Sequence, residues 1–220
     1  MTLPQRLTAE FIGTFTLIFV GVSSICMNTG TVGIAFAHGL ALVVMVSALG
    51  HISGGHFNPA VTMGVLVGGK ISPKDALAYI LSQLLGGVVG ALAVKAIVQP
   101  SVYGAVSLGT PMLAPDTGFG TGVLLEMILT FFLVTVVFGS AIDGRAGKWG
   151  GLFIGLTVAM DILAAGPITG ASMNPARTFG PALVGGYWND HLVYWIGPVI
   201  GGVLAGLVYT QWLRKEGVEA

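Results

Sequence analysis

Two copies of the tripeptide Asn-Pro-Ala have the clearest capacity for chemistry in this sequence, at Asn58-Pro59-Ala60 and Asn174-Pro175-Ala176. Proline suits the first turn of a helix, where its missing N–H costs nothing, and asparagine is a favoured N-cap because its side-chain oxygen accepts a backbone N–H. The side-chain NH2 is then free to act as a donor. Each tripeptide therefore predicts a helix start that presents a hydrogen-bond donor and roughly half a positive charge.

The composition places these helix starts in a membrane protein. Of the 220 residues, 54% are hydrophobic and only 8% are charged, whereas soluble domains carry about 25% charged residues. The 35 glycines fit closely packed transmembrane helices. The formal net charge of zero gives no indication of a nucleic-acid partner. The single cysteine, Cys26, excludes an internal disulfide and a zinc cluster.

Six apolar stretches are long enough to cross a bilayer, which takes about 20 residues. Two shorter ones begin at Asn58 and Asn174, and each follows a glycine-rich segment. Non-helical backbone at membrane depth is tolerated only inside protein or beside a water-filled cavity, so we expect these two to be re-entrant half-helices. The predicted spans are residues 7–27, 32–50, 77–98, 119–141, 149–166 and 192–213.

The basic residues predict the orientation of these spans. With a cytoplasmic N-terminus, every Lys and Arg except Lys95 and Arg177 falls on the cytoplasmic side, as the positive-inside rule favours. Both termini are therefore predicted to be cytoplasmic, and residues 214–220 form a short charged tail there. The residues on this side are Arg6, Lys70, Lys74, Arg145, Lys148, Arg214 and Lys215.

The sequence contains an internal repeat. Glu10 and Glu126 are 116 residues apart, as are Asn58 and Asn174, and the segments between them align without a gap. Each half holds three spans, so the second half is inverted relative to the first, and such repeats place a site near the membrane midplane. A duplicated packing scaffold would not explain why both halves keep a non-spanning segment. We predict one channel domain over residues 1–220, with repeats at about 5–98 and 119–213 and a loop at 99–118.

Two half-helix N-termini that meet at mid-membrane form a positive barrier. Water can hydrogen-bond there, whereas hydronium and metal cations are repelled. Arg177 follows Asn174 by three residues on a neighbouring face of the same turn, and the matching position in the first half is Val61. An arginine at membrane depth is costly and indicates a functional role. Snorkelling to the membrane surface is disfavoured, because the neighbours of Arg177 are apolar.

With both motifs intact, the sequence resembles the aquaporin (major intrinsic protein) family. The segments 51–62 and 170–177 carry the resemblance, which extends over essentially the whole chain. It implies an all-α membrane fold of six transmembrane helices and two half-helices, with a pore in each subunit of a homotetramer in lipid. It also implies passive passage of water and small neutral solutes, with protons and ions excluded. No enzymatic reaction, cofactor or metal is expected.

The resemblance assigns three further residues to a narrow filter beside Arg177. Strict water channels usually place an aromatic residue at the first filter position and a histidine at the second. Here a histidine is at the first and an aliphatic residue at the second, a set similar to plant vacuolar aquaporins and the ammonia-permeable animal branch. We therefore expect ammonia to pass beside water, with urea and hydrogen peroxide as further candidates; a buried, hydrogen-bonded histidine of the second span is the alternative for the first position. The three residues are His38, Ile162 and Ala171.

Glycerol is not an expected solute. Glycerol facilitators usually carry an aspartate directly after the filter arginine and a lysine a few positions later. This chain has Thr178 and Ala182 at those two places, and Tyr194-Trp195 in the last span is the choice of water channels.

Three acids are predicted to lie inside the membrane. We interpret Glu10 and Glu126 as acceptors for backbone N–H groups of the re-entrant loop in each half, because unpaired backbone there would cost several kcal/mol; a proton relay is the alternative. Asp161 points about 100° away from Ile162 around the fifth span. We interpret it as bonded to loop or neighbouring-helix groups, with pore lining as the alternative.

The glycine pair Gly54-Gly55 and His56 are predicted to line the cytoplasmic vestibule, where His56 could alternatively sense pH.

Two other classes of function fit an inverted repeat. An ion-coupled secondary transporter needs titratable groups at the midplane, but neither half-helix contains Asp or Glu. A structural membrane protein with a closed pore would have the same motifs without flux. Steady, unsaturated, gradient-driven flux distinguishes a channel from both.

Overall fold

The computed structural model describes residues 1–214, apart from the side chain of Ala146. Regular structure in that range is entirely helical, and six helices are long and apolar enough to cross a membrane. The all-α membrane fold is thus confirmed, and each predicted span overlaps one of these helices. They are α1 (Leu3–Cys26), α2 (Gly30–Ser53), α4 (Pro73–Ile97), α6 (Phe119–Val137) with the π-helical turn η2 (Phe138–Ile142), α7 (Gly150–Thr169) and α9 (Val193–Val208) with the π-helical turn η4 (Tyr209–Leu213).

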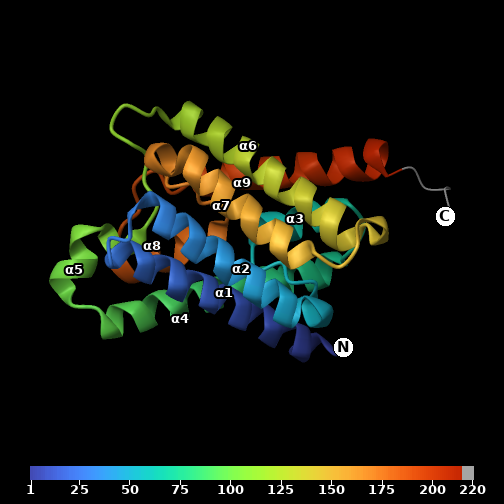
Figure 1. Ribbon diagram of the computed structural model, residues 1–220, viewed down its shortest axis with the longest axis horizontal. Helices are drawn as coiled ribbons and strands as arrows, with labels where there is room; N and C mark the ends of the chain where they lie inside the picture. The colour runs from blue at the N-terminus through green and yellow to red at the C-terminus, as the bar shows by residue number, and fades with distance from the viewer. Residues whose placement is uncertain (215–220) are drawn as a thin grey trace.

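Two shorter helices lie among the long ones. They are α3 (Pro59–Val67) and α8 (Pro175–Gly185), and both begin at the proline of an Asn-Pro-Ala tripeptide. The long helices run side by side along the molecule, with α3 toward one end and α8 toward the other (Figure 1). Neither short helix is long enough to cross a membrane alone, so each needs the surrounding bundle to bury it.

Small residues let the half-helices pack tightly on the opposite half of the chain. Helix α3 packs on α9, and α8 packs on α4. A Cβ added at Gly202 would lie 2.5 Å from the carbonyl oxygen of Ala60, and one at Gly87 would lie 2.7 Å from that of Ala176. Such close approach requires glycine, and the two half-helices thereby join the two halves into one bundle.

The segment 99–118 differs from the predicted loop. It contains α5 (Pro100–Ala105) and the short 3-10 turn η1 (Ser107–Gly109). Leu108 in this turn is fully buried and has a φ of 51°, a left-handed conformation that is rare for leucine. Burial of this side chain ties the segment to the bundle, which an unstructured loop would not need.

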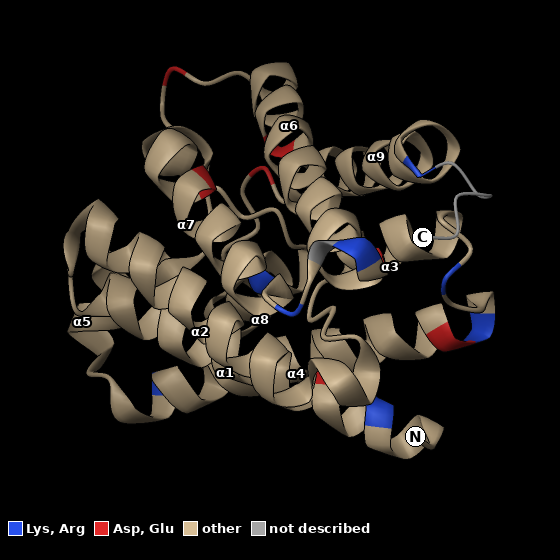
Figure 2. Ribbon diagram, turned by 45° about the vertical axis from the view of Figure 1, so that its right-hand side comes forward, with Lys and Arg blue, Asp and Glu red and all other residues tan. Residues whose placement is uncertain are grey.

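The start of α1 and the end of η4 lie at the same end of the bundle (Figure 1). A further 3-10 turn, η3 (Gly144–Ala146), connects η2 to α7 there. Lysines and arginines gather mainly at this end (Figure 2), which we call the inner end. The cytoplasmic placement of this end remains a prediction from charge. Lys215 and the rest of the predicted tail beyond Arg214 lie outside the described residues.

Candidate functional site

Both half-helices begin with the same asparagine cap. The side-chain oxygen of Asn58 accepts the N–H of Ala60 at 2.8 Å, and that of Asn174 accepts the N–H of Ala176 at 2.9 Å. Pro59 and Pro175 occupy the first helical positions. Since the caps satisfy helix donors with the oxygens, the amide NH2 groups are directed away from their own helices.

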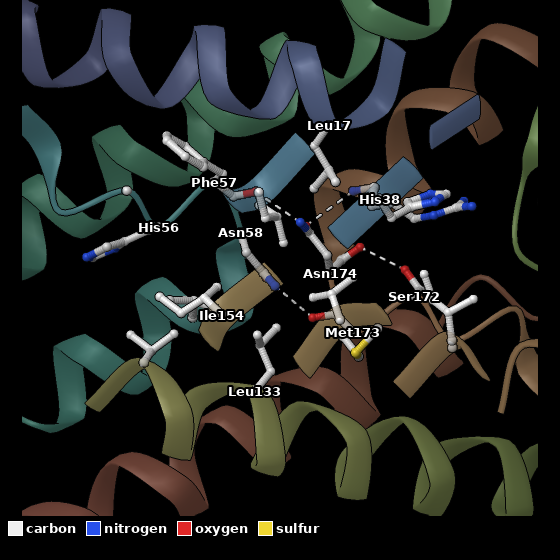
Figure 3. A pocket seen from close by; sticks show the side chains of 18 residues that line it. Leu17, His38, His56, Phe57, Asn58, Leu133, Ile154, Ser172, Met173 and Asn174 are labelled. Carbon is white, nitrogen blue, oxygen red and sulfur yellow. Dashed lines mark hydrogen bonds between the residues drawn. The ribbon is translucent and has the colours of Figure 1, made fainter. Parts of the chain in front are cut away.

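The two asparagines reach across to the opposite half of the chain. Asn58 Nδ2 donates to the carbonyl oxygen of Met173 at 2.8 Å, and Asn174 Nδ2 donates to that of Phe57 at 2.9 Å. The two side chains lie close together in the middle of a narrow cavity (Figure 3). The sequence predicted NH2 groups that are free to donate into the cavity, and this is only partly correct. Each uses one N–H to join the halves and retains one for a molecule in the cavity.

The residue just before each asparagine cap has a left-handed backbone conformation, which directs its carbonyl oxygen toward the opposite asparagine. Phe57 and Met173 have φ of 48° and 54°, although neither is a glycine, and both are buried. Phe57 and Met173 supply the carbonyl oxygens that bind the opposite asparagines. Such strained backbone persists only where the surroundings hold it.

Two buried carboxylates hold these strained loops. Glu10 accepts the backbone N–H of His56 at 3.0 Å and of Phe57 at 2.7 Å. Glu126 accepts the backbone N–H of Ser172 at 2.9 Å and of Met173 at 2.7 Å. Both carboxylates are fully buried. Several hydrogen bonds, rather than an ion pair with a cation, offset the free-energy cost of removing each carboxylate from water.

Three side chains whose supporting role was not predicted from the sequence complete this support. Gln83 donates to Glu10 at 2.7 Å. Tyr79 donates to the carbonyl oxygen of Ser53 at 2.8 Å, and Tyr194 donates to that of Thr169 at 2.7 Å, at equivalent points of the two loops. The spacing of the two tyrosines, 115 residues, is close to the repeat offset and could have revealed their shared role.

The four predicted filter residues lie together near the outer end of the cavity. All four line it, and each is at most 4% exposed. Arg177 Nη1 donates to the carbonyl oxygen of Gly109 at 2.7 Å. Gly109 ends the buried turn η1, so the segment 99–118 fixes the direction of the guanidinium, a contact that no sequence pattern indicated. The four residues are His38, Ile162, Ala171 and Arg177.

The ring of His38 is held between two helices. Its Nδ1 lies 2.9 Å from the carbonyl oxygen of Ile34, and because a carbonyl can only accept, Nδ1 carries the proton. Nε2 is then an acceptor in the neutral ring. On the other side the ring rests against Gly21 of α1, where an added Cβ would overlap Nε2. Gly21 therefore makes room for the filter histidine.

Gly21→Ala is expected to push the His38 ring out of position and lower water flux. Overpacking of this kind also destabilises a fold by about 1–3 kcal/mol. Stopped-flow measurement on reconstituted protein checks the flux, with Gly104→Ala as the control, because a Cβ there meets nothing within 4 Å. The double variant Gly21→Ala/His38→Ala should recover flux. Unchanged flux in Gly21→Ala alone would show that the ring does not limit passage.

The cavity itself has little open volume. Its volume open to the centre of a water-sized sphere is about 20 Å³, and one water needs roughly 10–15 Å³ on that measure. One wall is apolar, whereas the other carries the loops and the asparagines. His56 lies at the inner end and His38 toward the outer end (Figure 3). The apolar wall is formed by Leu133, Val137, Ile154, Val158 and Ile162.

Wider cavities adjoin both ends of the narrow one. An outer cavity of about 370 Å³ shares Ile162 and Arg177 with it, and an inner cavity of about 650 Å³ shares His56 and Val137. Gly54 also lines the inner cavity, and Gly55 lines the narrow one. The three cavities therefore follow one another, and the narrow part carries both asparagines and the filter residues.

Asp161 corrects one interpretation of the sequence. It is 1% exposed, and its Oδ2 has no hydrogen-bond partner among residues 1–214. The predicted bond to a loop or a neighbouring helix is therefore wrong for this oxygen. Asp161 does not line the narrow cavity either.

Within residues 1–214 no three His, Cys, Asp or Glu side chains are grouped so that they could hold a metal ion. The polar groups of the narrow cavity include amides, loop carbonyls, the Ser172 hydroxyl, one guanidinium and imidazoles, which can exchange hydrogen bonds with a passing neutral molecule.

Comparison with known proteins identifies the family. A family model described as Major intrinsic protein matches residues 1–209. Aquaporin TIP4-4 of Zea mays is 43% identical, over 97% of this chain and 88% of that protein. Aquaporin TIP2-1 of Arabidopsis thaliana is 45% identical, over 91% of this chain and 84% of that protein. The X-ray structure of the aquaglyceroporin from Plasmodium falciparum matches with a TM-score of 0.84 over 96% of this chain and 97% of that one; at 24% identity it shows the fold alone.

Proposed function

This chain belongs to the major intrinsic protein family, the aquaporin water channels, and from that premise we propose that it passes ammonia as well as water while it excludes protons and ions. The observation that carries the proposal is the narrow cavity, where two opposed half-helix caps and a relocated histidine meet a single arginine. Aquaporins are channels rather than enzymes, so the account concerns passive passage alone.

Proton exclusion is attributed to the meeting of α3 and α8. Each N-terminus contributes partial positive charge, and each asparagine retains one N–H for the cavity. A water molecule that accepts hydrogen bonds from both of these N–H groups has used both lone pairs. It therefore cannot also accept a proton from the neighbouring water molecule in the cavity. Hydronium and metal cations are repelled by the same charge and by Arg177.

Ammonia passage is attributed to the filter. An imidazole nitrogen at His38 can accept from a solute, and Arg177 can donate to one. Ammonia donates three hydrogen bonds and accepts one, so it can donate to His38 and accept from Arg177 within the same filter. Ile162 leaves an apolar surface where strict water channels carry a polar ring, which reduces the preference for water alone. Urea and hydrogen peroxide remain secondary candidates.

The double variant His38→Phe/Ile162→His tests this assignment, because it restores the arrangement of strict water channels. Ammonia permeability is expected to fall roughly tenfold, toward that of the lipid, whereas water permeability remains, since the caps and Arg177 are unchanged. Both solutes are measured by stopped-flow on the same proteoliposomes. The single variant Leu124→Ile, at an exposed site on α6, serves as a matched control. Full ammonia flux in the double variant would mean that the filter is assigned to the wrong residues.

A coupled transporter is less well supported. Its proton relay would need Glu10 or Glu126, and every oxygen of both carboxylates already accepts at least one hydrogen bond from a loop or a side chain.

We further propose a homotetramer with both termini in the cytoplasm. Rows of large apolar side chains face outward from the bundle, among them Leu77, Leu81 and Leu85 on α4 and Phe36, Leu40 and Val44 on α2. Such an apolar surface can contact either lipid or the other subunits of a tetramer. Native mass measurement in detergent checks the tetramer, and protease access to an added terminal tag in oriented membranes checks the termini.

A further inference from the structure

We propose that the inner cavity binds a phosphate-bearing anion, which lies across the inner mouth of the narrow cavity and lowers flux. We call this cavity the inner vestibule; the residues that carry the argument are Arg6, His51, Lys70, Lys148, Gly150 and Gly151, all of which line it. The binding rests on these residues alone, and its effect on flux rests on the proposed channel function.

Fixed positive charge converges on the inner vestibule from three separate segments. Arg6 comes from α1, Lys70 follows α3, and Lys148 precedes α7, while none of the lining residues among positions 1–214 is Asp or Glu. The ion pairs within residues 1–214 are Arg6 with Asp75, at 3.0 Å, and Arg145 with Asp143. Lys70 and Lys148 therefore have no carboxylate partner in that part of the chain.

The start of α7 adds backbone donors to the same cavity. This helix begins at Gly150 and has no side-chain cap. Its first N–H groups are consequently not satisfied by a capping oxygen, and the positive end of a 20-residue helix faces the vestibule. Helix N-termini beside lysine side chains are a common setting for phosphate. Gly150 and Gly151 both line the vestibule, so the backbone of this first turn borders the cavity.

Membrane orientation alone does not require this convergence. The positive-inside rule needs only cations near the inner membrane surface. Lys74, Arg145 and Arg214 meet that need without lining the vestibule. The additional feature that calls for an anion is the presence of two lysines without a carboxylate partner in residues 1–214, the paired Arg6 and a helix N-terminus around one cavity.

The volume of the vestibule limits which anion can bind, and its position determines the effect of that anion on flux. At about 650 Å³ it falls in the range of small-molecule sites, roughly 300–1,000 Å³, so a phosphate ester or a phospholipid headgroup fits. It shares His56 and Val137 with the narrow cavity. A bound anion therefore stands in the path of any solute that passes through the inner mouth.

Titration with pyrophosphate tests the proposal. The full-length protein in phosphatidylcholine vesicles is equilibrated with pyrophosphate on both sides, and water flux is followed by stopped-flow. Binding is measured separately by calorimetry on protein in detergent. We expect saturable binding and a parallel fall in flux, and in the double variant Lys70→Gln/Lys148→Gln an apparent Kd raised roughly tenfold or more. Lys74→Gln, an exposed lysine at the same end that does not line the vestibule, is the matched control and should behave as the unmodified protein.

A second set of vesicles identifies the source of the anion. These contain phosphatidylinositol phosphate in place of soluble pyrophosphate. A fall in flux only with this lipid, again lost in Lys70→Gln/Lys148→Gln, supports the site and assigns it to a headgroup. Absence of binding in both arms, or equal binding in the double variant and in Lys74→Gln, overturns the proposal. Absence of water flux without any anion refutes the channel function instead, and the calorimetry still tests the site.

Discussion

Replacement of Arg177 by valine together with His38 by alanine is expected to open the filter to larger solutes and to cations. Both side chains line the narrow cavity and are almost fully buried. Valine is the residue at the matching position of the first half, Val61. The substitution therefore removes the one guanidinium of the cavity and leaves an apolar surface that the repeat already accommodates.

The reason for the expected leak is electrostatic. A positive charge held at low dielectric repels a nearby cation by several kcal/mol, so its removal should raise proton and cation passage by at least roughly tenfold. Glycerol and urea should enter as well, because two large polar side chains are gone. Proton flux is measured with a pH-sensitive dye inside vesicles, and solute flux by vesicle swelling.

The matched control for this variant is Lys95→Gln. Lys95 is exposed and donates to the carbonyl oxygen of Val184 outside the narrow cavity. It should alter neither proton nor solute flux. A double variant that still excludes glycerol and leaks no protons, while folded to the same extent as the control, would show that the constriction lies elsewhere.

Replacement of Glu126 by leucine is expected to prevent stable folding. The carboxylate accepts two loop N–H groups and the hydroxyl of Thr169, and leucine accepts none. Each buried donor left without a partner costs about 1–3 kcal/mol, so the total loss exceeds about 3 kcal/mol. Glu10→Leu should do the same in the other half, where Gln83 also loses one of its two acceptors and keeps only Thr62. Thermal unfolding in detergent measures both losses.

The conservative variants Glu10→Gln and Glu126→Gln separate support from proton relay. A glutamine oxygen can still accept from the loop, so we expect folded protein with reduced thermal stability and with water flux largely retained. If the carboxylate were a proton relay, the glutamine variant would instead lose proton transport entirely. A glutamine variant that is as stable as the unmodified protein but carries no flux would contradict the supporting role.

Much of the fold followed from the sequence because its signals are local or repeated. Length and hydropathy predict the spans, and the Asn-Pro pairs predict where α3 and α8 begin. The offset between Glu10 and Glu126 matches that between the motifs, which places each carboxylate near its own loop. These inferences need no knowledge of how distant segments pack.

The features that were not predicted depend on contacts between distant segments. The carbonyl of Gly109 orients Arg177 across 68 residues of chain, and Gly21 makes room for His38 from a different helix. The reciprocal bonds of Asn58 and Asn174 to opposite loops use N–H groups that a lone motif leaves free. Asp161 lacks a partner for Oδ2 among the described residues. No spacing in the sequence carries such information.

The measurement that most directly tests the central account is stopped-flow flux of water and ammonia on one preparation of the unmodified protein in proteoliposomes. The account predicts fast, unsaturated water flux with a low activation energy, ammonia flux well above that of lipid vesicles, and no proton conductance. Fast water flux with ammonia at the level of the lipid would contradict the role of His38 and Ile162 and would leave a channel for water alone.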